Sequence, residues 1–396
     1  MTLRVEPSHF KPDTLLPGSK SHANRFLILA ARIGDGVVIR SLPQSEDVQY
    51  LLLALKKIGL QIDGADAACF KNKFPECEKK QLQPIEIEVG EGGTTARFLL
   101  VLLASGKNEY VLKMKARLSE RPWDELIDAL KVAGAKIEWL DNQLHVQGPI
   151  ELAKLPQSIS AARSTQFASA LKLAFHQDGY NLRPEELKTS QAYWQMTLDC
   201  CQEIAKRDVN VPLDWSSAAY PLVFAAVSDK PVKLAGLKKD AQADSILFDL
   251  LKERGAITQN ENGIQGHGLK TRPPLDLSIS SCPDLSIALA YLCSHLKGKS
   301  VLRDVSVLRH KESDRLQALL DLLKHVQIEA SYDQSKDTLE IVGGEPKAPA
   351  SLSVPADHRL VMVGVLFLMK SGGTITHSGA VNKSFPQFFE QIIRER

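Results

Sequence analysis

ELIDALKVAGAKI (residues 125–137) has the pattern of an amphipathic helix, a glycine stop and the start of a β-strand. Its Leu and Ile residues recur at helical spacing. A lysine stands in the last turn, where the negative end of the helix dipole favours a cation. Gly134 follows, and glycine suits the left-handed residue that ends many helices. The segment therefore predicts a helix that leads directly into a strand.

The same pattern occurs at four other places, LLLALKKIGLQI (51–62), LDCCQEIAKRDVNV (198–211), LFDLLKERGAIT (247–258) and LQALLDLLKHVQIEA (316–330). Measured between the helix ends, three of the four intervals are about 71–75 residues, and the interval from Asp208 to Gly255 is about 47. The spacing indicates a repeat of roughly 70 residues, although any α/β protein shows helix–glycine–strand steps. The short interval makes residues 209–215 the best candidate for a domain junction.

β-prone runs lie between these helices, which favours an α/β class over an all-α or all-β one. They are YVLKMKA (110–116), QLHVQGPIEL (143–152), PVKLAGL (231–237), SVLRDVSVL (300–308), TLEIVGG (338–344) and GTITHSG (373–379). The 396 residues exceed what one hydrophobic core usually serves, so we expect two domains, or three.

The composition excludes several classes of protein. A net charge of +2 argues against a nucleic-acid or membrane-surface binder. The sequence has no apolar run long enough for a membrane span and no secretory signal at MTLRVEPSHFKP (1–12). The 6 cysteines have neither disulfide-framework nor zinc-site spacing. We expect a cytoplasmic protein with reduced thiols.

Several expected helices begin with basic residues, although the positive end of the helix dipole favours acids. Exposed N–H groups, hydroxyls and a cation together form a site for phosphate or carboxylate. One such helix start is weak evidence, since its cation can pair with a neighbouring acid, but five indicate that the protein binds small anions. The five segments are LPGSKSHANRFLILAARIG (16–34), VGEGGTTARFLLVLLASG (89–106), LSERPWDELIDALK (118–131), ARSTQFASALKLAF (162–175) and PADHRLVMVGVLFLMK (355–370).

SVLRHKESDRLQALLDLLK (306–324) adds further cations. Lys311 and Arg315 are four apart, so we expect them on one face of a helix, where like charges are unfavourable unless an anion lies between them. Alternatively, the carboxylates of Glu312 and Asp314 offset the repulsion between these two cations. In LSERPWDELIDALK, Pro122 is the expected first helical residue.

Together these segments resemble the 5-enolpyruvylshikimate-3-phosphate synthase family. PGSKSHANR (17–25) resembles its N-terminal signature and LRHKESDR (308–315) its second signature. Further segments match in the same order: GGTTAR (92–97), ERP (120–122), STQF (164–167), DWSSAAY (214–220), DLS (284–286), DHR (357–359) and KSFPQFF (383–389). The resemblance covers nearly the whole chain.

The resemblance implies a fold, the enolpyruvyl transferase fold or inside-out α/β barrel, in which two similar domains each contain three βαβαββ repeats. Residues 1–17 and 213–396 would form domain 1, on the phosphoenolpyruvate and catalytic carboxylate side. Residues 18–212 would form domain 2, on the shikimate 3-phosphate side, with the active site in the cleft between the domains. The implied reaction moves the enolpyruvyl group of phosphoenolpyruvate to the 5-hydroxyl of shikimate 3-phosphate and releases phosphate. No metal or organic cofactor is implied, and a monomer is expected.

The resemblance also implies two sets of binding residues. Those for shikimate 3-phosphate are Lys20, Ser21, Arg25, Ser164, Thr165, Gln166, Ser190, Tyr193, Asp284 and Lys311. Those for phosphoenolpyruvate are Lys20, Gly93, Arg97, Arg121, Gln166, Arg315, Arg359 and Lys383.

The implied reaction removes a proton from a hydroxyl and delivers one to a methylene carbon, so acid–base groups must flank the reacting atoms. We expect Asp284 at the hydroxyl and Glu312 near the methylene, with Lys20 or Lys383 completing proton transfer. Asp214 and Asp357 are expected to orient arginines, and His22, His310 and His358 to serve in packing or ligand contact.

Some positions depart from the family pattern, among them Phe98, Val307 and, above all, Glu91, which stands where Asn or Ser is usual. A carboxylate there would repel phosphoenolpyruvate unless it faces Arg97 or solvent. Two alternatives stay open: a catalytically impaired homologue that only binds phosphorylated ligands, which Glu91 supports, and a UDP-N-acetylglucosamine enolpyruvyl transferase, which shares the implied fold. The second uses a loop cysteine for which this sequence has no counterpart between Cys77 and Cys200.

Overall fold

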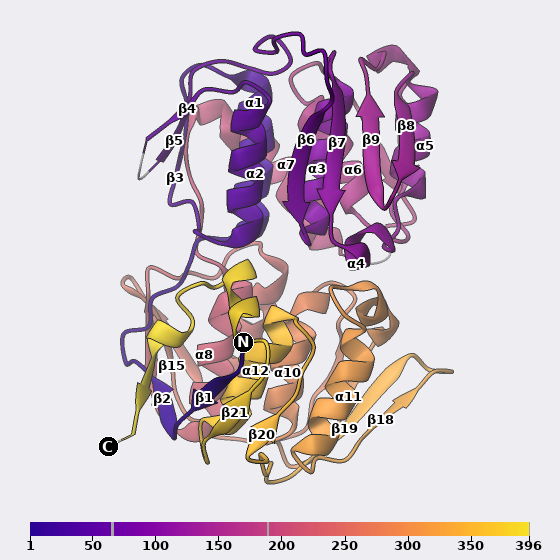
Figure 1. Cartoon of the computed structure of the whole chain (residues 1–396). Helices are drawn as coiled ribbons and strands as arrows, with labels where there is room; N and C mark the ends of the chain where they lie inside the picture. The colour runs from indigo at the N-terminus through magenta and orange to yellow at the C-terminus, as the bar shows by residue number, and fades with distance from the viewer. Residues whose placement is uncertain (65–66, 188–189, 396) are drawn as a thin grey trace. The chain divides into compact units, whose positions relative to one another are not determined.

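The computed structural model describes residues 1–64, 67–187 and 190–395. The chain divides into two compact units, Met1–Pro17 with Leu213–Arg396 and Gly18–Pro212 (Figure 1). We call the first domain 1 and the second domain 2. Backbone hydrogen bonds tie the ends of each unit together, from Ser19 to Pro212 at 2.7 Å in domain 2 and from Asp214 to Pro17 at 3.0 Å in domain 1.

The helices of domain 2 are α1 (Lys20–Ile33), α2 (Glu46–Lys57), α3 (Gly93–Ala104), α4 (Ala116–Ser119), α5 (Asp124–Val132), α6 (Gln166–Ala174) and α7 (Gln191–Glu203). Its strands are β3 (Val37–Arg40), β4 (Ile62–Asp63), β5 (Ala67–Phe70), β6 (Ile85–Gly90), β7 (Glu109–Met114), β8 (Lys136–Leu140), β9 (Gln143–Gln147), β10 (Ser158–Ser160), β11 (Arg183–Glu185) and β12 (Asp208–Asn210).

The helices of domain 1 are α8 (Trp215–Ser228), α9 (Ile246–Glu253), α10 (Ser286–Cys293), α11 (Arg315–His325) and α12 (His358–Leu368). Its strands are β1 (Leu3–Val5), β2 (Ser8–Phe10), β13 (Val232–Ala235), β14 (Ile257–Asn260), β15 (Gly263–Gly266), β16 (Asp276–Ser278), β17 (Gly298–Arg303), β18 (Ala330–Asp333), β19 (Thr338–Gly343), β20 (Ser351–Leu352), β21 (Gly373–Ile375) and β22 (Ile392–Arg394).

Among the described residues, each domain contains one βαβαββ unit formed by a continuous stretch of chain. In domain 2, β6 and β7 are parallel and joined through α3, and α5 leads into the β8–β9 hairpin, which gives the strand order β6-β7-β9-β8. In domain 1, β16, α10, β17, α11, β18 and β19 repeat this arrangement in the order β16-β17-β19-β18. The predicted repeat is therefore a structural unit, and the two domains are built alike.

Strands from distant parts of the chain complete other units. In domain 2, β12 pairs in parallel with β3 and closes the sheet β12-β3-β5-β4. In domain 1, Asp13 forms a parallel bridge to Lys233 of β13, and β1 pairs with β21. In the described chain α7 leads to β12 and then directly to α8, without a hairpin of its own. The missing hairpin accounts for the short interval of about 47 residues in the sequence repeat.

The glycines predicted to end helices adopt left-handed backbone angles. The φ angles are +104° at Gly59, +107° at Gly134 and +66° at Gly255. In the two copies of the sequence repeat whose helix is not followed by glycine, Arg207 and Gln327 adopt this left-handed conformation, with φ of +60° and +61°. The predicted run 300–308 is only partly a strand, because β17 ends at Arg303 and η5 (Val305–His310) is a 3-10 helix.

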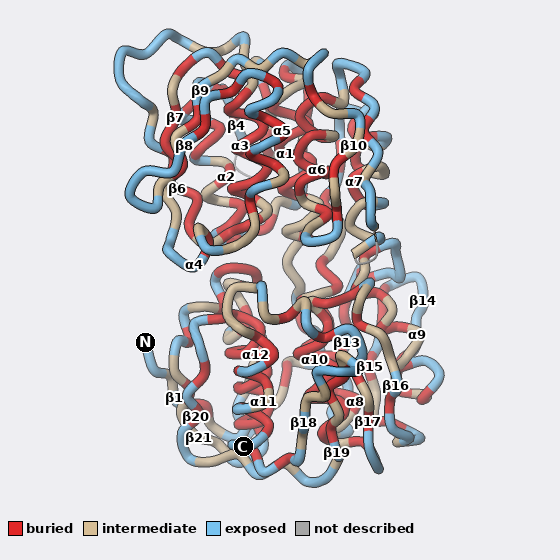
Figure 2. Tube along the Cα trace, turned by 90° about the vertical axis from the view of Figure 1, so that its right-hand side faces the viewer, coloured by how far each residue is buried: buried red, intermediate tan, exposed pale blue. Residues whose placement is uncertain are grey.

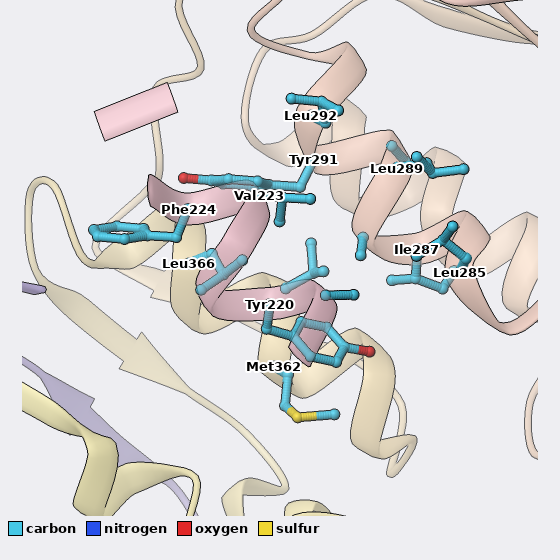
Figure 3. Packing of buried hydrophobic residues seen from close by; sticks show 14 of the residues in the cluster. Tyr220, Val223, Phe224, Leu285, Ile287, Leu289, Tyr291, Leu292, Met362 and Leu366 are labelled. Atoms are coloured by element: carbon cyan, nitrogen blue, oxygen red, sulfur yellow. The ribbon is translucent and has the colours of Figure 1, made fainter. Parts of the chain in front are cut away.

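Each domain has its own apolar core, built from the first helix of each repeat (Figure 2). In domain 1, α8, α10 and α12 pack on one another, and their side chains, among them Tyr220, Phe224, Leu289 and Met362, belong to one buried cluster (Figure 3). In domain 2, α1, α3 and α6 do the same. Of these helices, α3, α8, α10 and α12 are apolar on nearly all sides, which is typical of helices enclosed by other elements. The sheets pack around them, as expected for an inside-out α/β barrel.

Candidate active site

In domain 1, Arg315 is the centre of a group of three carboxylates. Its Nε donates to Asp357 Oδ2 at 2.8 Å, its Nη1 donates to Asp284 Oδ1 at 2.9 Å, and its Nη2 lies 2.7 Å from Glu312 Oε2. Burial alone would lower the pKa of Arg315, but the carboxylates of Asp357, Glu312 and Asp284 outweigh it and raise the pKa above its ordinary value. Arg315 thus holds the acids of this site in place, and its expected contact with a substrate stays a prediction.

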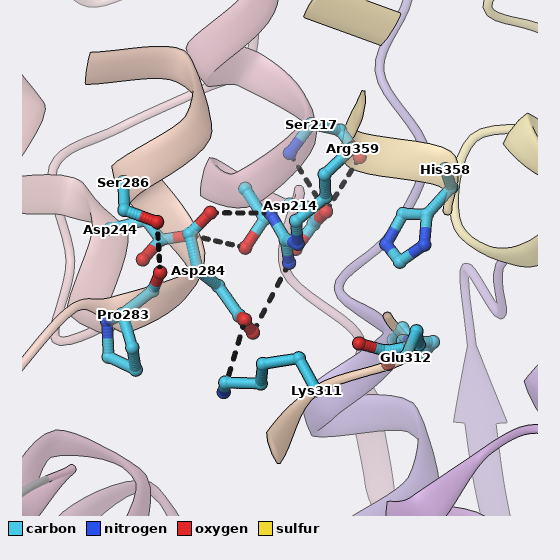
Figure 4. Close-up of polar contacts among 12 residues, drawn as sticks. Asp214, Ser217, Asp244, Pro283, Asp284, Ser286, Lys311, Glu312, His358 and Arg359 are labelled. Atoms are coloured by element: carbon cyan, nitrogen blue, oxygen red, sulfur yellow. Dashed lines mark hydrogen bonds and ion pairs between the residues drawn. The ribbon is translucent and has the colours of Figure 1, made fainter. Parts of the chain in front are cut away.

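Asp284 lies on the short 3-10 helix η4 (Pro283–Leu285) and faces three cations. Besides Arg315, Lys311 Nζ lies 3.3 Å from Oδ1 and Arg359 Nη2 lies 3.3 Å from Oδ2. Figure 4 shows Lys311 and Arg359 reaching this carboxylate from opposite sides. Burial would raise the pKa of Asp284, but Arg359, Lys311 and Arg315 together hold it well below its usual value.

Glu312 connects this group to Lys383, which ends the 3-10 helix η6 (Ser378–Lys383). Glu312 Oε1 lies 3.5 Å from Lys383 Nζ, while its Oε2 faces Arg315. Both side chains are mostly buried, at 14% exposed for Glu312 and 7% for Lys383. A carboxylate and an ammonium at this distance can exchange a proton through a bound molecule, as acid–base chemistry requires.

The expectation that Lys311 and Arg315 share one face of a helix is wrong. Helix α11 begins at Arg315, with Asp314 as its N-cap, and Lys311 lies before it in extended conformation, with φ of −94° and ψ of −162°. The two cations approach each other because both contact Asp284, so a carboxylate relieves their repulsion.

Asp244, on the 3-10 helix η3 (Ala243–Ser245), is a buried acid that sequence reasoning missed. Its side chain accepts a hydrogen bond from Ser216 Oγ. Burial raises the pKa of Asp244 to about 7, although the positive charge of Arg359 opposes the shift. The sequence around Asp244, QAD (242–244), has neither the helix-start pattern nor the cluster of basic residues from which the site was predicted.

Two other acids of domain 1 were expected to orient arginines. Asp357 orients Arg315, as expected, whereas Asp214 caps α8 by accepting hydrogen bonds from the backbone and hydroxyl of Ser217.

In domain 2, Lys20 begins α1 and pairs with Asp47, another acid that sequence reasoning missed. Lys20 Nζ lies 2.7 Å from Asp47 Oδ2, and the side chains are 21% and 6% exposed. Asp47 stands in the first turn of α2, where an acid is ordinary, so its sequence position gave no hint of a role.

At the start of α3, two glycines allow side chains to come close to the backbone. A Cβ on Gly93 would lie 2.7 Å from Arg121 Nη1, and a Cβ on Gly92 would lie 2.8 Å from Asp47 Oδ1. The guanidinium of Arg121 therefore lies beside Gly93 in the first turn of α3, and a cation beside a helix N-terminus suits an anion. The expectation that Pro122 begins a helix is wrong, because α5 begins at Asp124 with Trp123 as its N-cap.

Arg97 is engaged inside domain 2. Its Nη1 donates to Gln166 Oε1 at 2.5 Å and its Nη2 donates to the Pro122 carbonyl at 2.6 Å. Its guanidinium also lies over the rings of Trp123 and Phe167, 5.2 Å from each centroid. Gln166 Nε2 in turn donates to Thr94 Oγ1 at 3.0 Å, so this network connects α3 to α6.

Arg25 is likewise buried, at 2% exposed. It donates to Thr197 Oγ1 at 2.9 Å and to the backbone carbonyls of Ser21 at 2.9 Å and Tyr193 at 3.0 Å. Burial lowers the pKa of Arg25 from its ordinary value. These contacts bring Ser21, Arg25 and Tyr193 together where α1 meets α7, and their expected role in substrate binding stays a prediction.

The hydroxyls of Ser164 and Thr165 precede α6, whose N-cap is Thr165, and Ser164 Oγ accepts from the Gln166 backbone at 3.2 Å. Ser190 caps α7 in left-handed conformation with φ of +60°. Arg163, the basic residue at the start of segment 162–175, pairs on the surface with Asp124 at 2.9 Å and Glu125 at 2.7 Å.

Glu91 pairs with Lys115 at the start of α3. Its Oε1 lies 2.9 Å from Lys115 Nζ, and its side chain is 30% exposed.

Among the histidines of the family motifs, His22 is neutral. Burial and the charge of Arg25 lower the pKa of His22 to about 3, so its imidazole is neutral at physiological pH.

Comparison with known proteins identifies the family. The model of the family described as EPSP synthase (3-phosphoshikimate 1-carboxyvinyltransferase) matches residues 7–203 and 184–392. The chain belongs to the EPSP synthase family. A 3-phosphoshikimate 1-carboxyvinyltransferase of Escherichia coli is 30% identical and covers 96% of this chain and 95% of its own. One from Aliivibrio salmonicida is 29% identical, with 95% of both chains covered.

Solved structures agree on the fold. EPSP synthase from Acinetobacter baumannii superposes with a TM-score of 0.76 at 21% identity and covers 100% of both chains. The enolpyruvyl transferase NikO from Streptomyces tendae gives a TM-score of 0.72 at 15% identity, with 98% of this chain and 96% of NikO covered. The predicted enolpyruvyl transferase fold is therefore confirmed, and the chain is an enzyme of the EPSP synthase family, a transferase of the shikimate pathway. The alternative functions considered from the sequence are not favoured.

In the part of the chain that the structure describes, no helix is long and apolar enough to cross a membrane.

Proposed function

We propose that the protein transfers the enolpyruvyl group of phosphoenolpyruvate to the 5-hydroxyl of shikimate 3-phosphate. The oxygen of that hydroxyl adds to C2 of phosphoenolpyruvate while the methylene carbon gains a proton. Loss of a methyl proton and cleavage of the C–O bond to phosphate then restore the double bond and release inorganic phosphate. The observation that carries this proposal is the position of two carboxylates, Asp284 and Glu312, on one guanidinium, that of Arg315.

Asp284 is the proposed base at the 5-hydroxyl. With Lys311, Arg315 and Arg359 around it, the carboxylate is a weak base, because its pKa lies well below its usual value. Substrate phosphate or carboxylate groups that engage Lys311 and Arg359 would take positive charge away from Asp284 and raise its pKa again. Binding of the substrates would thereby activate the base only when both are in place.

Glu312 and Lys383 are the proposed proton carriers at the methylene carbon. Their separation of 3.5 Å leaves them in contact, and both side chains are mostly shielded from water. Lys20, which pairs with Asp47, would assist in proton transfer or neutralise the phosphate of phosphoenolpyruvate. Shielding from water would protect the tetrahedral adduct from side reactions.

The binding roles follow the division expected from the sequence. For shikimate 3-phosphate we propose Lys20, Ser21, Arg25, Ser164, Thr165, Gln166, Ser190, Tyr193, Asp284 and Lys311. For phosphoenolpyruvate we propose Lys20, Gly93, Arg97, Arg121, Gln166, Arg315, Arg359 and Lys383. Arg121 beside Gly93 supports this best, because a guanidinium against a helix N-terminus suits a small anion. Arg25, Arg97 and Arg315 also hydrogen-bond within the protein, so each would position its neighbours as well as bind substrate.

Incubation of the purified protein with both substrates tests this function. Phosphate should be released only when phosphoenolpyruvate and shikimate 3-phosphate are both present. A folded protein that releases no phosphate would refute the proposal. That both groups of residues act on one pair of substrates in a cleft between the domains stays a prediction, as do a cytoplasmic location and a monomeric state.

A further inference from the structure

Glu91 places a negative charge directly before the proposed phosphoenolpyruvate site. It precedes Gly92, the N-cap of α3, and the next residue is Gly93, against which Arg121 lies. The amides at this helix start and the guanidinium attract an anion, whereas a carboxylate repels it. The chain therefore needs a feature that cancels the charge of Glu91.

Lys115 is placed by the sheet to do this. The parallel strands β6 and β7 pair Gly90 with Met114, so the residues after each strand, Glu91 and Lys115, emerge side by side. The Lys115 backbone donates to the Gly90 carbonyl at 3.2 Å, and Lys115 Nζ lies 2.9 Å from Glu91 Oε1. The pair is thus determined by strand register and not by chance contact of two surface side chains.

The backbone around the pair is tightly constrained. Gly90 has a φ of +60°, and a Cβ there would lie 2.7 Å from the Tyr50 ring. The hydrogen bond to Glu91 raises the pKa of Lys115 and outweighs the opposing effect of partial burial. The ammonium consequently stays charged throughout the physiological pH range. The side chain of Lys115 is 68% exposed, and a pair this exposed contributes little to folding.

We propose that Lys115 is a positioning residue that neutralises Glu91 and so keeps the start of α3 able to accept phosphoenolpyruvate. This inference rests on the proposed function and adds to it a residue outside the expected binding sets. Lys115 acts by offsetting the charge of Glu91. Replacing Lys115 should therefore affect phosphoenolpyruvate binding only while Glu91 is present.

The test measures steady-state kinetics for Lys115→Gln, Glu91→Gln and the double variant. Lys115→Gln should raise the KM for phosphoenolpyruvate about three- to fivefold, the size of effect expected for an exposed charge pair. Its kcat and its KM for shikimate 3-phosphate should stay within about twofold. The double variant should return to the unmodified KM, and the effect of Lys115→Gln should shrink at high salt because exposed charges are screened.

Lys113→Gln is the matched control. Lys113 lies two residues earlier on β7 and pairs with Glu86 at 2.8 Å, away from the helix start. Its loss removes the same charge two residues away but should leave the KM for phosphoenolpyruvate unchanged. An equal rise in KM for Lys113→Gln and Lys115→Gln would overturn the proposal, since the effect would then be one of overall charge.

Two further outcomes would also overturn it: an unchanged KM in Lys115→Gln, or a double variant that is no better than Lys115→Gln. Calorimetric binding of phosphoenolpyruvate in the presence of shikimate 3-phosphate is measured in parallel. Binding without turnover in the unmodified protein would refute the proposed function, and the affinities of the variants would still decide the role of Lys115. If the unmodified protein neither binds nor turns over phosphoenolpyruvate, both proposals fail.

Discussion

Arg315 and Asp357 form a two-point ion pair from which water is almost completely excluded. Nε lies 2.8 Å from Oδ2 and Nη2 lies 3.4 Å from Oδ1, and the side chains are 1% and 0% exposed. Asp357 also caps α12 by accepting from the Arg359 backbone at 2.9 Å. One buried carboxylate thus orients the arginine that holds Asp284 and Glu312.

Asp357→Asn should therefore destabilise domain 1. Removing one charge of a buried pair typically costs about 3–5 kcal/mol, and the loss here should lie below that range because Asp284 and Glu312 still face Arg315. Unfolding in urea, followed by tryptophan fluorescence, measures the loss. Asp276→Asn is the control, because Asp276 pairs with Arg303 on the surface and its loss should not be measurable. Equal losses in the two variants would contradict the central role given to Asp357.

Asp284→Ala should abolish turnover while substrates still bind. Loss of a general base typically costs about 10²- to 10⁴-fold in rate, whereas removal of a negative charge near Lys311 and Arg359 does not weaken attraction of anions. Phosphate release measures the rate and calorimetry measures binding of shikimate 3-phosphate. Near-normal turnover in this variant would exclude Asp284 from the chemistry.

Lys311→Ala should weaken binding of shikimate 3-phosphate by about tenfold or more, as expected when a charge-assisted hydrogen bond is lost. Calorimetry measures the affinity. Lys299→Ala serves as the control, because Lys299 pairs with Glu340 on the exposed side of a sheet. Unchanged affinity in Lys311→Ala would refute its assignment to the substrate phosphate.

Gly93→Ala should raise the KM for phosphoenolpyruvate by about tenfold, the effect of losing roughly one charged hydrogen bond. The new Cβ would lie 2.7 Å from Arg121 Nη1 and 3.0 Å from its Cζ, so the flexible guanidinium must move away. The fold should be unaffected, because only the end of a side chain is displaced. Thermal unfolding checks the fold, and an unchanged KM would show that Arg121 does not bind the substrate from this position.

Asp244 should make the stability of domain 1 depend on pH. Its folded pKa of about 7 exceeds the ordinary value of 3.8, so the folded state holds the proton more tightly than the unfolded state. Its contribution to stability is full below about pH 4 and is lost as the pH rises to about 7. Asp244→Asn should remove this loss. The stability of the variant relative to the unmodified protein should therefore be higher at pH 8 than at pH 4. Parallel pH profiles of the variant and the unmodified protein would contradict the burial of a protonated Asp244.

The sequence alone determined the repeating unit and the family signatures. Helical periodicity, a basic last turn and a following glycine are local signals, and Gly59, Gly134 and Gly255 adopt the left-handed angles that these signals predict. The resemblance identified the acids and cations at the site because signatures such as LRHKESDR are contiguous in the chain. Helix-end patterns and contiguous signatures depend only on neighbouring residues, so they can be recognised without knowing which helices and strands pack together.

Tertiary structure alone decided which groups face one another. Asp47 and Asp244 occupy ordinary sequence positions, and only packing places one beside Lys20 and buries the other. Lys311 and Arg315 were expected on one helix, but the chain bends before α11 and both converge on Asp284. Likewise β12 completes a sheet that begins far earlier in the chain. The physical reason is that burial, ion pairing and strand pairing depend on distances in space, which neighbouring residues in the sequence do not specify.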